Sequence, residues 1–310
     1  ASSFNQPISQ SMVTVGSKTY EAWNVKKASS LRSTFALATN FNQDISNWDI
    51  SGSTSLHNTF FQALNFNQSL NLWNTMNVTT LNSTFAQTPF NNGGAPLSSS
   101  YQNHPTRGEY IAWDTSKVTN MNQTFFNYSR DNSNPNPGFN QDENNWDTSN
   151  VTTLLGTFSG INNTHTASFN QDISTKQVTI GAGTSLARTY NAWDVSKVET
   201  FGNTPLYERS ADVQLGMFAH NPYFNQPIGN WQINTGSDID VSLKFMFYYN
   251  TAFNQNISSS IVTVGSKTYT AWDTKRVNNL YSTFGYTSNF NQPIGNWNLT
   301  NVKTMRLMLS

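Results

Sequence analysis

An acidic residue directly follows five of the nine tryptophans of this 310-residue chain: Asp49, Asp114, Asp147, Asp194 and Asp273. A stack of such carboxylates would offer the oxygen ligands that Ca²⁺ takes in proteins. The other four tryptophans are followed by an amide side chain, at Asn24, Asn74, Gln232 and Asn298. A calcium ladder would be interrupted at each of these, whereas Asp and Asn both cap turns by bonding to the backbone two residues on. We therefore expect turn caps at this position, and no metal or other cofactor.

The remaining polar residues do not suggest catalysis. The four histidines stand at unrelated positions relative to the tryptophans, at His57, His104, His165 and His220. The chain has no phosphate-binding P-loop, no glycine-rich dinucleotide turn and no zinc-ligand spacing. We therefore expect that this protein is not an enzyme.

Six tyrosines offer a different chemistry, because an exposed aromatic ring can stack on a sugar. Two of them are adjacent and four stand shortly before a tryptophan: Tyr248 and Tyr249, and Tyr20, Tyr110, Tyr190 and Tyr269. The four tyrosines that stand shortly before a tryptophan are also placed where their rings would extend a buried aromatic column. Carbohydrate binding and core packing both stay open for these residues, with core packing favoured.

The tryptophans themselves belong to a repeat. Each follows a Phe-Asn-Gln signature, which begins at Phe4, Phe41, Phe66, Phe139, Phe169, Phe224, Phe253 and Phe290, with a degenerate form at Phe90. Trp23, Trp48 and Trp73 are spaced by 25 residues, and longer intervals carry insertions. We call each segment from one signature Phe to the next a copy, and nine copies follow one another. A fixed period of this length is typical of a stacked repeat array.

Apolar residues hold fixed offsets within a copy. An aliphatic residue such as Ile45 stands four positions after the signature Phe, except where Gly94 and Glu143 replace it. Apolar residues 5, 8 and 12 positions after Trp, such as Val151 and Phe158, have the spacing of one helix face. The segment before Trp is short and is expected to be a strand. The sequence thus predicts a β-solenoid of about nine coils of 25 residues, each a parallel strand plus a short helical turn.

One continuous core is expected to run through residues 1–310, which we interpret as a single repeat array. Neither end carries a polar cap, so we expect a segment of a longer array. The predicted core consists of all nine tryptophans and most of the signature phenylalanines: Trp23, Trp48, Trp73, Trp113, Trp146, Trp193, Trp231, Trp272, Trp297, Phe41, Phe66, Phe139, Phe169, Phe224, Phe253 and Phe290.

The Asn of the signature is present in every copy. The full signatures supply Asn5, Asn42, Asn67, Asn140, Asn170, Asn225, Asn254 and Asn291. A short amide has both donors and acceptors, and it can satisfy backbone groups that a chain reversal leaves without partners. We favour this structural role for the Asn ladder over ligand binding.

Four copies lengthen the stretch between signature and Trp. The segment at 13–20, Val-Thr-Val-Gly-Ser-Lys-Thr-Tyr, recurs at 262–269, and a longer relative spans 178–190. Alternating Val and Thr around a Gly-Ser-Lys tip predict a β-hairpin. Insertions on one face of a repeat array often form its contact surface. Equally, such hairpins could only widen a sheet and cover apolar side chains.

The composition of the chain argues against nucleic acid and a membrane span as partners. The charges of seventeen basic and seventeen acidic residues cancel, and only 11% of the residues are charged. We therefore expect no basic patch that could bind nucleic acid. No run of about 18 apolar residues could span a membrane. Nine Asn-x-Ser/Thr sequons predict a glycoprotein, and we expect Asn127 and Asn162, in variable loops, to be exposed.

Three segments resemble the repeat of the BspA-like leucine-rich-repeat surface proteins: FNQDISNWD at 41–49, FNQPIGNW at 290–297 and WDTSNVT at 146–152. The resemblance covers the whole chain and implies that the predicted solenoid is leucine-rich-repeat-like. It also implies an extracellular, often lipid- or wall-anchored protein, with a role in adhesion or an unknown role. The hairpin insertions and the Thr-Phe in place of Met-Phe depart from that pattern.

We therefore expect an extracellular, non-enzymatic cell-surface protein that mediates adhesion through contacts with protein or glycan. The alternative is a structural subunit of an extracellular filament, built by end-to-end stacking, whose partners are other copies of itself.

Overall fold

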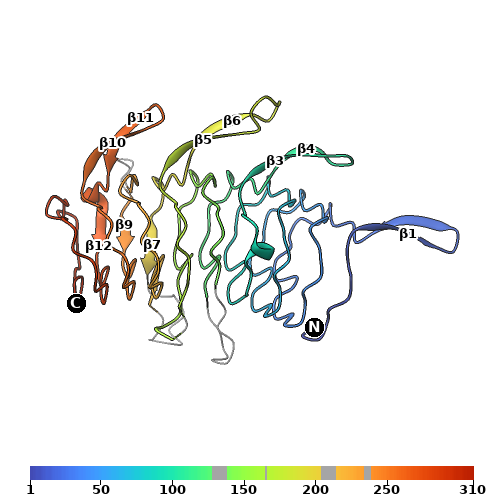
Figure 1. Ribbon diagram of the computed structural model, residues 1–310, viewed down its shortest axis with the longest axis horizontal. Helices are drawn as coiled ribbons and strands as arrows, with labels where there is room; N and C mark the ends of the chain where they lie inside the picture. The colour runs from blue at the N-terminus through green and yellow to red at the C-terminus, as the bar shows by residue number, and fades with distance from the viewer. Residues whose placement is uncertain (128–137, 165, 204–213, 234–238) are drawn as a thin grey trace.

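The computed structural model describes residues 1–127, 138–164, 166–203, 214–233 and 239–310. Successive copies lie side by side along the long axis, with the two termini toward opposite ends (Figure 1). Backbone hydrogen bonds join equivalent positions of neighbouring copies. The N–H of Leu31 donates to the carbonyl of Ser55 at 3.0 Å, and that of Phe35 to the carbonyl of Thr59 at 2.8 Å. The chain is therefore a stack of copies held together by their backbones.

Most regular strands lie in hairpins. Four antiparallel pairs form two-stranded sheets: β1 (Ser11–Val15) with β2 (Lys18–Ala22), β3 (Ser100–His104) with β4 (Gly108–Ala112), β5 (Lys176–Ile180) with β6 (Arg188–Ala192), and β10 (Ser260–Val264) with β11 (Lys267–Ala271). Each predicted insertion thus contains a hairpin. In the first, Val13 pairs with Tyr20, and in the last, Val262 pairs with Tyr269.

One further sheet has four short strands in the order β12-β9-β7-β8. Its members are β7 (Thr200–Asn203), β8 (Leu215–Gly216), β9 (Val241–Leu243) and β12 (Val277–Asn279). Strands β7, β9 and β12 are parallel, and β8 is antiparallel to β7. Among the described residues, helical structure consists of two 3-10 turns, η1 (Asn92–Gly94) and η2 (Thr274–Arg276).

The predicted leucine-rich-repeat-like β-solenoid, with a parallel strand and a helical turn in each copy, is wrong. The described residues contain no α-helix, and their two-stranded sheets are all antiparallel. Outside the four-stranded sheet, the parallel pairing of the described residues is confined to single bridges, such as Ser55 with Thr80 and Thr80 with Asn120. The body of each copy is built mostly of turns.

Left-handed backbone explains why no α-helix forms after Trp in the described copies. Ser33 has φ of 57° and Leu37 has φ of 61°, and equivalent residues in other copies repeat these values. The N–H of Thr34 donates to Leu31 at 3.1 Å in a turn, while the N–H groups of Leu31 and Ser33 bond to the next copy. Those N–H groups cannot also reach the carbonyl four residues earlier, as an α-helix requires. The expected strand before Trp is likewise a turn, in which the N–H of Trp48 donates to Ile45 at 3.1 Å.

Aromatic columns fill the core. The signature rings of neighbouring copies lie 5.9–6.4 Å apart from Phe4 to Phe290, and a second column runs from Phe35 to Phe284 with spacings of 5.4–6.2 Å. Offset stacking at such distances is favourable. Eight tryptophans are buried, whereas Trp23 is 50% exposed. Each of those eight donates its indole N–H to a carbonyl in an earlier copy, as Trp231 does to Ile173 at 2.9 Å.

The signature Asn residues form a continuous ladder. The side-chain Oδ1 of each accepts the backbone N–H of the next, from Asn5 with Asn42 at 2.9 Å to Asn254 with Asn291 at 2.9 Å. In most copies the following Gln also donates to the same oxygen, as Gln226 does to Asn170 at 3.0 Å. The ladder satisfies one backbone donor per copy and thereby sets the register between copies.

Candidate functional site

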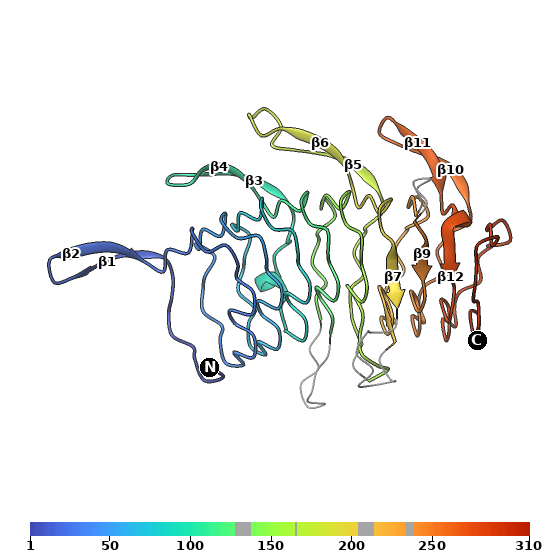
Figure 2. The ribbon, with the colours of Figure 1, turned by 180° about the vertical axis from the view of Figure 1, so that it is seen from behind.

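The four hairpins line one edge of the molecule, although they come from copies far apart in the sequence (Figures 1 and 2). The hairpins β3–β4, β5–β6 and β10–β11 lean toward the N-terminal end, over the copies that precede them, and β1–β2 projects past the stack at that end (Figure 1). The first and last hairpins carry exposed apolar side chains, with Met12 and Val15 in β1 66% and 64% exposed and Ile261 in β10 72% exposed. We call this side of the molecule the hairpin edge.

In three of these hairpins, a tyrosine of the hairpin binds it to the preceding copy. The hydroxyls of Tyr110 and Tyr269 donate to the carbonyls of Leu72 and Asn230 at 2.8 and 2.6 Å, and Tyr190 makes the equivalent bond. In each case the accepting carbonyl directly precedes a tryptophan. Burial raises the pKa of Tyr190 and Tyr269 to about 12. These rings therefore brace the hairpins and are not open platforms for a sugar.

In two of the hairpins, a cationic side chain forms an ion pair with an acidic residue two copies earlier. Arg188 Nη2 lies 2.7 Å from Asp114 Oδ1, and Lys267 Nζ lies 3.7 Å from Asp194 Oδ2. Arg188 also lies over the ring of Tyr190, with its guanidinium carbon 5.0 Å from the ring centroid. The lean of these hairpins is therefore held by a hydroxyl bond and an ion pair.

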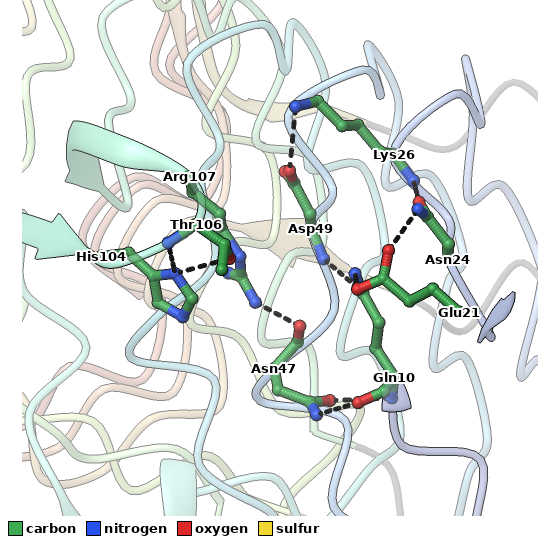
Figure 3. Close-up of a pocket in the computed structure, with 9 residues that line it drawn as sticks. All are labelled: Gln10, Glu21, Asn24, Lys26, Asn47, Asp49, His104, Thr106 and Arg107. Atoms are coloured by element: carbon green, nitrogen blue, oxygen red, sulfur yellow. Dashed lines mark hydrogen bonds and ion pairs between the residues drawn. The ribbon is translucent and has the colours of Figure 1, made fainter. Parts of the chain in front are cut away.

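A crevice of about 330 Å³ lies between the base of the first hairpin and the tip of the second. Its lining is almost entirely polar and comes from Gln10, Glu21, Asn24, Lys26, Asn47, Asp49, His104, Thr106 and Arg107. Figure 3 shows Lys26, Asn24, Glu21 and Gln10 on one side and the hairpin-tip residues His104, Thr106 and Arg107 on the other. The size is that of a typical small-ligand site.

The carboxylates of the crevice already have donors. Glu21 accepts from Gln10 Nε2 at 2.7 Å and from Asn24 Nδ2 at 2.6 Å. Asp49 is 4% exposed, and its Oδ2 lies 3.8 Å from Lys26 Nζ. Its Oδ1 accepts the N–H two residues on, at 3.1 Å. Each carboxylate therefore already accepts at least one hydrogen bond, and its oxygens keep further acceptor positions.

The amides of the crevice are also paired. Asn47 Oδ1 accepts the N–H of Gln10 at 3.1 Å, and Asn47 Nδ2 donates to the carbonyl of Gln10 at 2.8 Å. Gln10 Oε1 accepts the N–H of Asp49 at 3.2 Å. The floor of the crevice is thus a closed set of hydrogen bonds that holds its shape.

Two groups at the tip of the second hairpin retain open donors. Arg107 donates from Nη2 to the carbonyl of Asn47, but its Nη1 is buried and has no hydrogen-bond partner among the described residues. His104 Nδ1 accepts the N–H of Thr106 at 3.3 Å, so the neutral ring carries its proton on Nε2. No described carboxylate lies within ion-pair distance of Arg107. The hydrogen-bonding capacity that remains in the crevice therefore includes carboxylate acceptors as well as donors.

The sequence matches a family described as "Mycoplasma protein of unknown function, DUF285" over residues 1–99, 95–205, 182–268 and 263–310. The chain belongs to this family. The four successive matches also show that it is a repeat protein. No curated protein matches the chain, and no solved structure does.

In this DUF285 member the acidic residues after Trp cap turns, as predicted. Their Oδ1 atoms accept the N–H two residues on at 2.9–3.2 Å, and Asn24, Asn74 and Asn298 do the same. Across the described ranges no group of three or more His, Cys, Asp or Glu side chains could hold a metal ion. The same part of the chain contains no helix long and apolar enough to cross a membrane.

The two predicted glycosylation sites of this DUF285 member differ. Asn162 is exposed, and its Oδ1 accepts the N–H of Thr164 at 3.0 Å. The expected exposure of Asn127 is wrong, because its side chain is only 5% exposed and its Nδ2 donates to the carbonyl of Thr166 at 2.8 Å. Asn127 is buried because it lies inside the stack, where it pairs with Gly160 of the next copy. The variable loop sequence beside it did not indicate this burial.

The histidines of this DUF285 member have separate environments. His104 lies in the crevice, and His165 lies outside the described residues. His220 is buried against the tyrosine rings of a neighbouring copy, and burial lowers its pKa to about 4. Its Nδ1 lies 3.0 Å from Asn163 Oδ1. No hydrogen bond or ring contact joins His57, His104 and His220 to one another within the described structure.

Sequence reasoning did not single out Arg107. Its signal is faint: the second insertion carries Pro-Thr-Arg at 105–107, where the first and last hairpins carry Gly-Ser-Lys. The crevice forms only because this tip reaches back to Asn47, 60 residues earlier. A contact of that kind is set by the lean of the hairpin, which no local pattern encodes.

Proposed function

We propose that this repeat protein acts at the cell surface as a non-enzymatic adhesive protein, and that its hairpin edge contacts a protein or glycan. The observation that carries the proposal is the alignment of four hairpins, contributed by distant copies, along one edge (Figure 2). Insertions on a single face of a repeat array commonly form its binding surface.

Two further observations support a contact role. Exposed apolar side chains at Met12, Val15 and Ile261 cover strands that have no second layer of structure outside them. These residues place exposed apolar side chains at the two ends of the hairpin edge, where they can contribute contact area to a partner. The resemblance of the repeat to BspA-like surface proteins supports an extracellular location.

The test compares two variants of the purified protein for binding to cultured epithelial cells, measured by flow cytometry of the labelled protein. The first combines Met12→Ser, Val15→Ser and Ile261→Ser on the hairpin edge. We expect its apparent affinity to fall by about tenfold or more, which corresponds to 1.4 kcal/mol or more.

The matched control combines Leu37→Ser and Leu64→Ser, which remove residues of 54% and 45% exposure outside the hairpins. This variant should bind as the unchanged protein does. Equal loss in both variants, or no loss in the first, would refute a role for the hairpin edge. Electron microscopy at high dilution separates the filament alternative, because persistent filaments would point to a structural subunit and isolated particles to a surface adhesive.

A further inference from the structure

The hairpins β1–β2 and β10–β11 share a sequence but not an environment. The segments 13–20 and 262–269 are identical, and both hairpins pair in the same register. In β10–β11, Val264 is 9% exposed and Tyr269 8% exposed, whereas the equivalent Val15 and Tyr20 of β1–β2 are 64% and 50% exposed. The face that β10–β11 buries against its own chain is therefore uncovered in β1–β2.

The contacts of β10–β11 define what such a hairpin binds. The hydroxyl of Tyr269 donates to the carbonyl of Asn230 at 2.6 Å, and Lys267 Nζ lies 3.7 Å from Asp194 Oδ2. Asn230 directly precedes the Trp of the preceding copy, and Asp194 directly follows the Trp two copies earlier. The hairpin β5–β6 uses the same two positions. We call these two positions, in the two copies before that of the hairpin, the seat of the hairpin.

The first copy carries further donors that have no acceptor among the described residues. The other eight tryptophans donate an indole N–H to an earlier copy, but no described residue accepts that of Trp23. Every later signature Asn donates its backbone N–H to the preceding signature Asn, and within the described chain that of Asn5 has no such acceptor. The described structure also gives Lys18 no acidic partner. Together with Tyr20, these groups fit the side of a further copy of the same repeat.

The eighth and ninth copies carry the acceptors that these donors require, in the same order. Asn296 is exposed and directly precedes the Trp of the ninth copy, and Asp273 directly follows the Trp of the eighth. The ninth copy also offers the carbonyl of Ile294 to an indole and Asn291 Oδ1 to a backbone N–H, since the equivalent groups of the eighth copy accept those bonds from the ninth. Within the described residues, the chain therefore has a hairpin without a seat and a seat on which no hairpin lies.

We propose that β1–β2 and Trp23 of one molecule dock on the eighth and ninth copies of a second molecule of this chain. The hydroxyl of Tyr20 donates to the carbonyl of Asn296 in this contact, and Lys18 pairs with Asp273. The two contacting surfaces differ, so molecules associate head to tail and each keeps one surface open for a further molecule. The hairpin edges of successive molecules then lie in one line. This partner is different from the protein or glycan of the proposed function, and the inference does not rest on that function.

Sedimentation velocity of the purified chain at increasing protein concentration tests the contact. We expect the average mass to rise past that of a dimer, because a head-to-tail contact does not close. The head variant combines Lys18→Glu with Tyr20→Phe, and the tail variant combines Asp273→Asn with Asn291→Ala. Asp273→Asn keeps the turn cap, as the equivalent Asn298 does. Each variant should raise the dissociation constant by about tenfold or more.

A mixture of the head and tail variants distinguishes this contact from any other. The head variant keeps its eighth and ninth copies unchanged and the tail variant keeps its first hairpin unchanged, so the mixture should form a dimer and stop there. The matched control combines Lys267→Glu with Tyr269→Phe in β10–β11, whose seat lies in its own chain. This control should change the dissociation constant by less than about twofold. Tryptophan fluorescence during thermal unfolding checks that each variant is folded.

Four outcomes would overturn the inference. The unchanged chain could keep the mass of a monomer at every concentration, or its association could stop at a dimer. The head and tail variants could associate as tightly as the unchanged chain, or their mixture could stay monomeric. A chain that associates head to tail but does not attach to cells would leave this contact standing and refute only the adhesive function.

Discussion

Replacing Glu143 by leucine should stabilise the protein. Glu143 occupies the position that is aliphatic in most other copies, and its carbonyl accepts the indole N–H of Trp193 at 3.1 Å, as the aliphatic residues' carbonyls do elsewhere. Its side chain is fully buried, and neither carboxylate oxygen has a hydrogen-bond partner in the part of the chain that the structure describes. Burial, reinforced by the nearby charge of Asp142, raises the pKa of this carboxyl well above its usual range.

The magnitude follows from two contributions. An unsatisfied buried polar group costs about 1–3 kcal/mol, and Glu143→Leu removes it. The second contribution depends on pH. Because the native state holds the proton more tightly than the unfolded state, the stability of the unchanged protein is greatest below the unfolded pKa and falls as pH rises toward the native pKa. Each unit of pH in that interval removes about 1.4 kcal/mol, so the advantage of Glu143→Leu grows toward alkaline pH.

Urea unfolding followed by tryptophan fluorescence measures both contributions. The free energy of unfolding would be compared for the unchanged protein and Glu143→Leu at pH 4 and at pH 8. We expect the variant to be more stable at both values, with the larger difference at pH 8. Glu143→Gln separates the causes, because it removes the titration but keeps a polar group in the core. It should flatten the pH dependence without the gain at pH 4.

A variant Glu143→Leu that is less stable than the unchanged protein at pH 8 would refute the reasoning. So would a pH dependence that survives unchanged in Glu143→Leu, since the titration would then belong to other groups.

Three further predictions concern the stack and its braces. Trp146→Ala, which empties a fully buried site, should lower the free energy of unfolding by about 3–5 kcal/mol, and Trp23→Ala, at a half-exposed site, by less than half as much, both measured by urea unfolding. A loss under about 1 kcal/mol for Trp146→Ala would show that the tryptophan does not belong to a packed core. Tyr269→Phe removes the hydroxyl bond to Asn230 and should cost about 0.5–1.5 kcal/mol, seen as faster amide hydrogen exchange in β10 and β11. Asn170→Ala interrupts the ladder, leaves a backbone N–H of the next copy without its acceptor, and should lower the urea midpoint by an amount equal to about 1–3 kcal/mol.

The sequence predicted the hairpins well because their signals are local. The alternating Val and Thr at 13–20 and 262–269 flank a tip that contains Gly, and a hairpin needs nothing more distant. The prediction of a helical turn was wrong because apolar residues 5, 8 and 12 positions after Trp are compatible with one helix face and also with a run of turns that contain left-handed residues. Ser33 and Leu37 adopt positive φ where a helix would need negative φ, and no residue type at those positions announces it.

The crevice was beyond prediction for a different reason. Its walls meet because Tyr110 donates to the backbone carbonyl of Leu72 and Arg107 to that of Asn47. Every residue has a backbone carbonyl, so such partners leave no mark in the sequence. Leu97 was missed for a similar reason. The fixed offset from Phe90 points to Gly94, but the turn η1 shifts the aliphatic residue three positions along the chain. The backbone carbonyl of Leu97 therefore accepts the indole N–H of Trp146.

The Asn ladder makes the length of this protein open to genetic change. Its bonds join the same position in adjacent copies whether 24 residues separate them, as between Asn67 and Asn91, or 55, as between Asn170 and Asn225. An in-frame duplication or deletion of one whole copy in the gene would therefore bring an equivalent acceptor and donor together at the new junction. Recombination between copies can lengthen or shorten the molecule in whole steps, and the bonding between neighbours stays the same at every step.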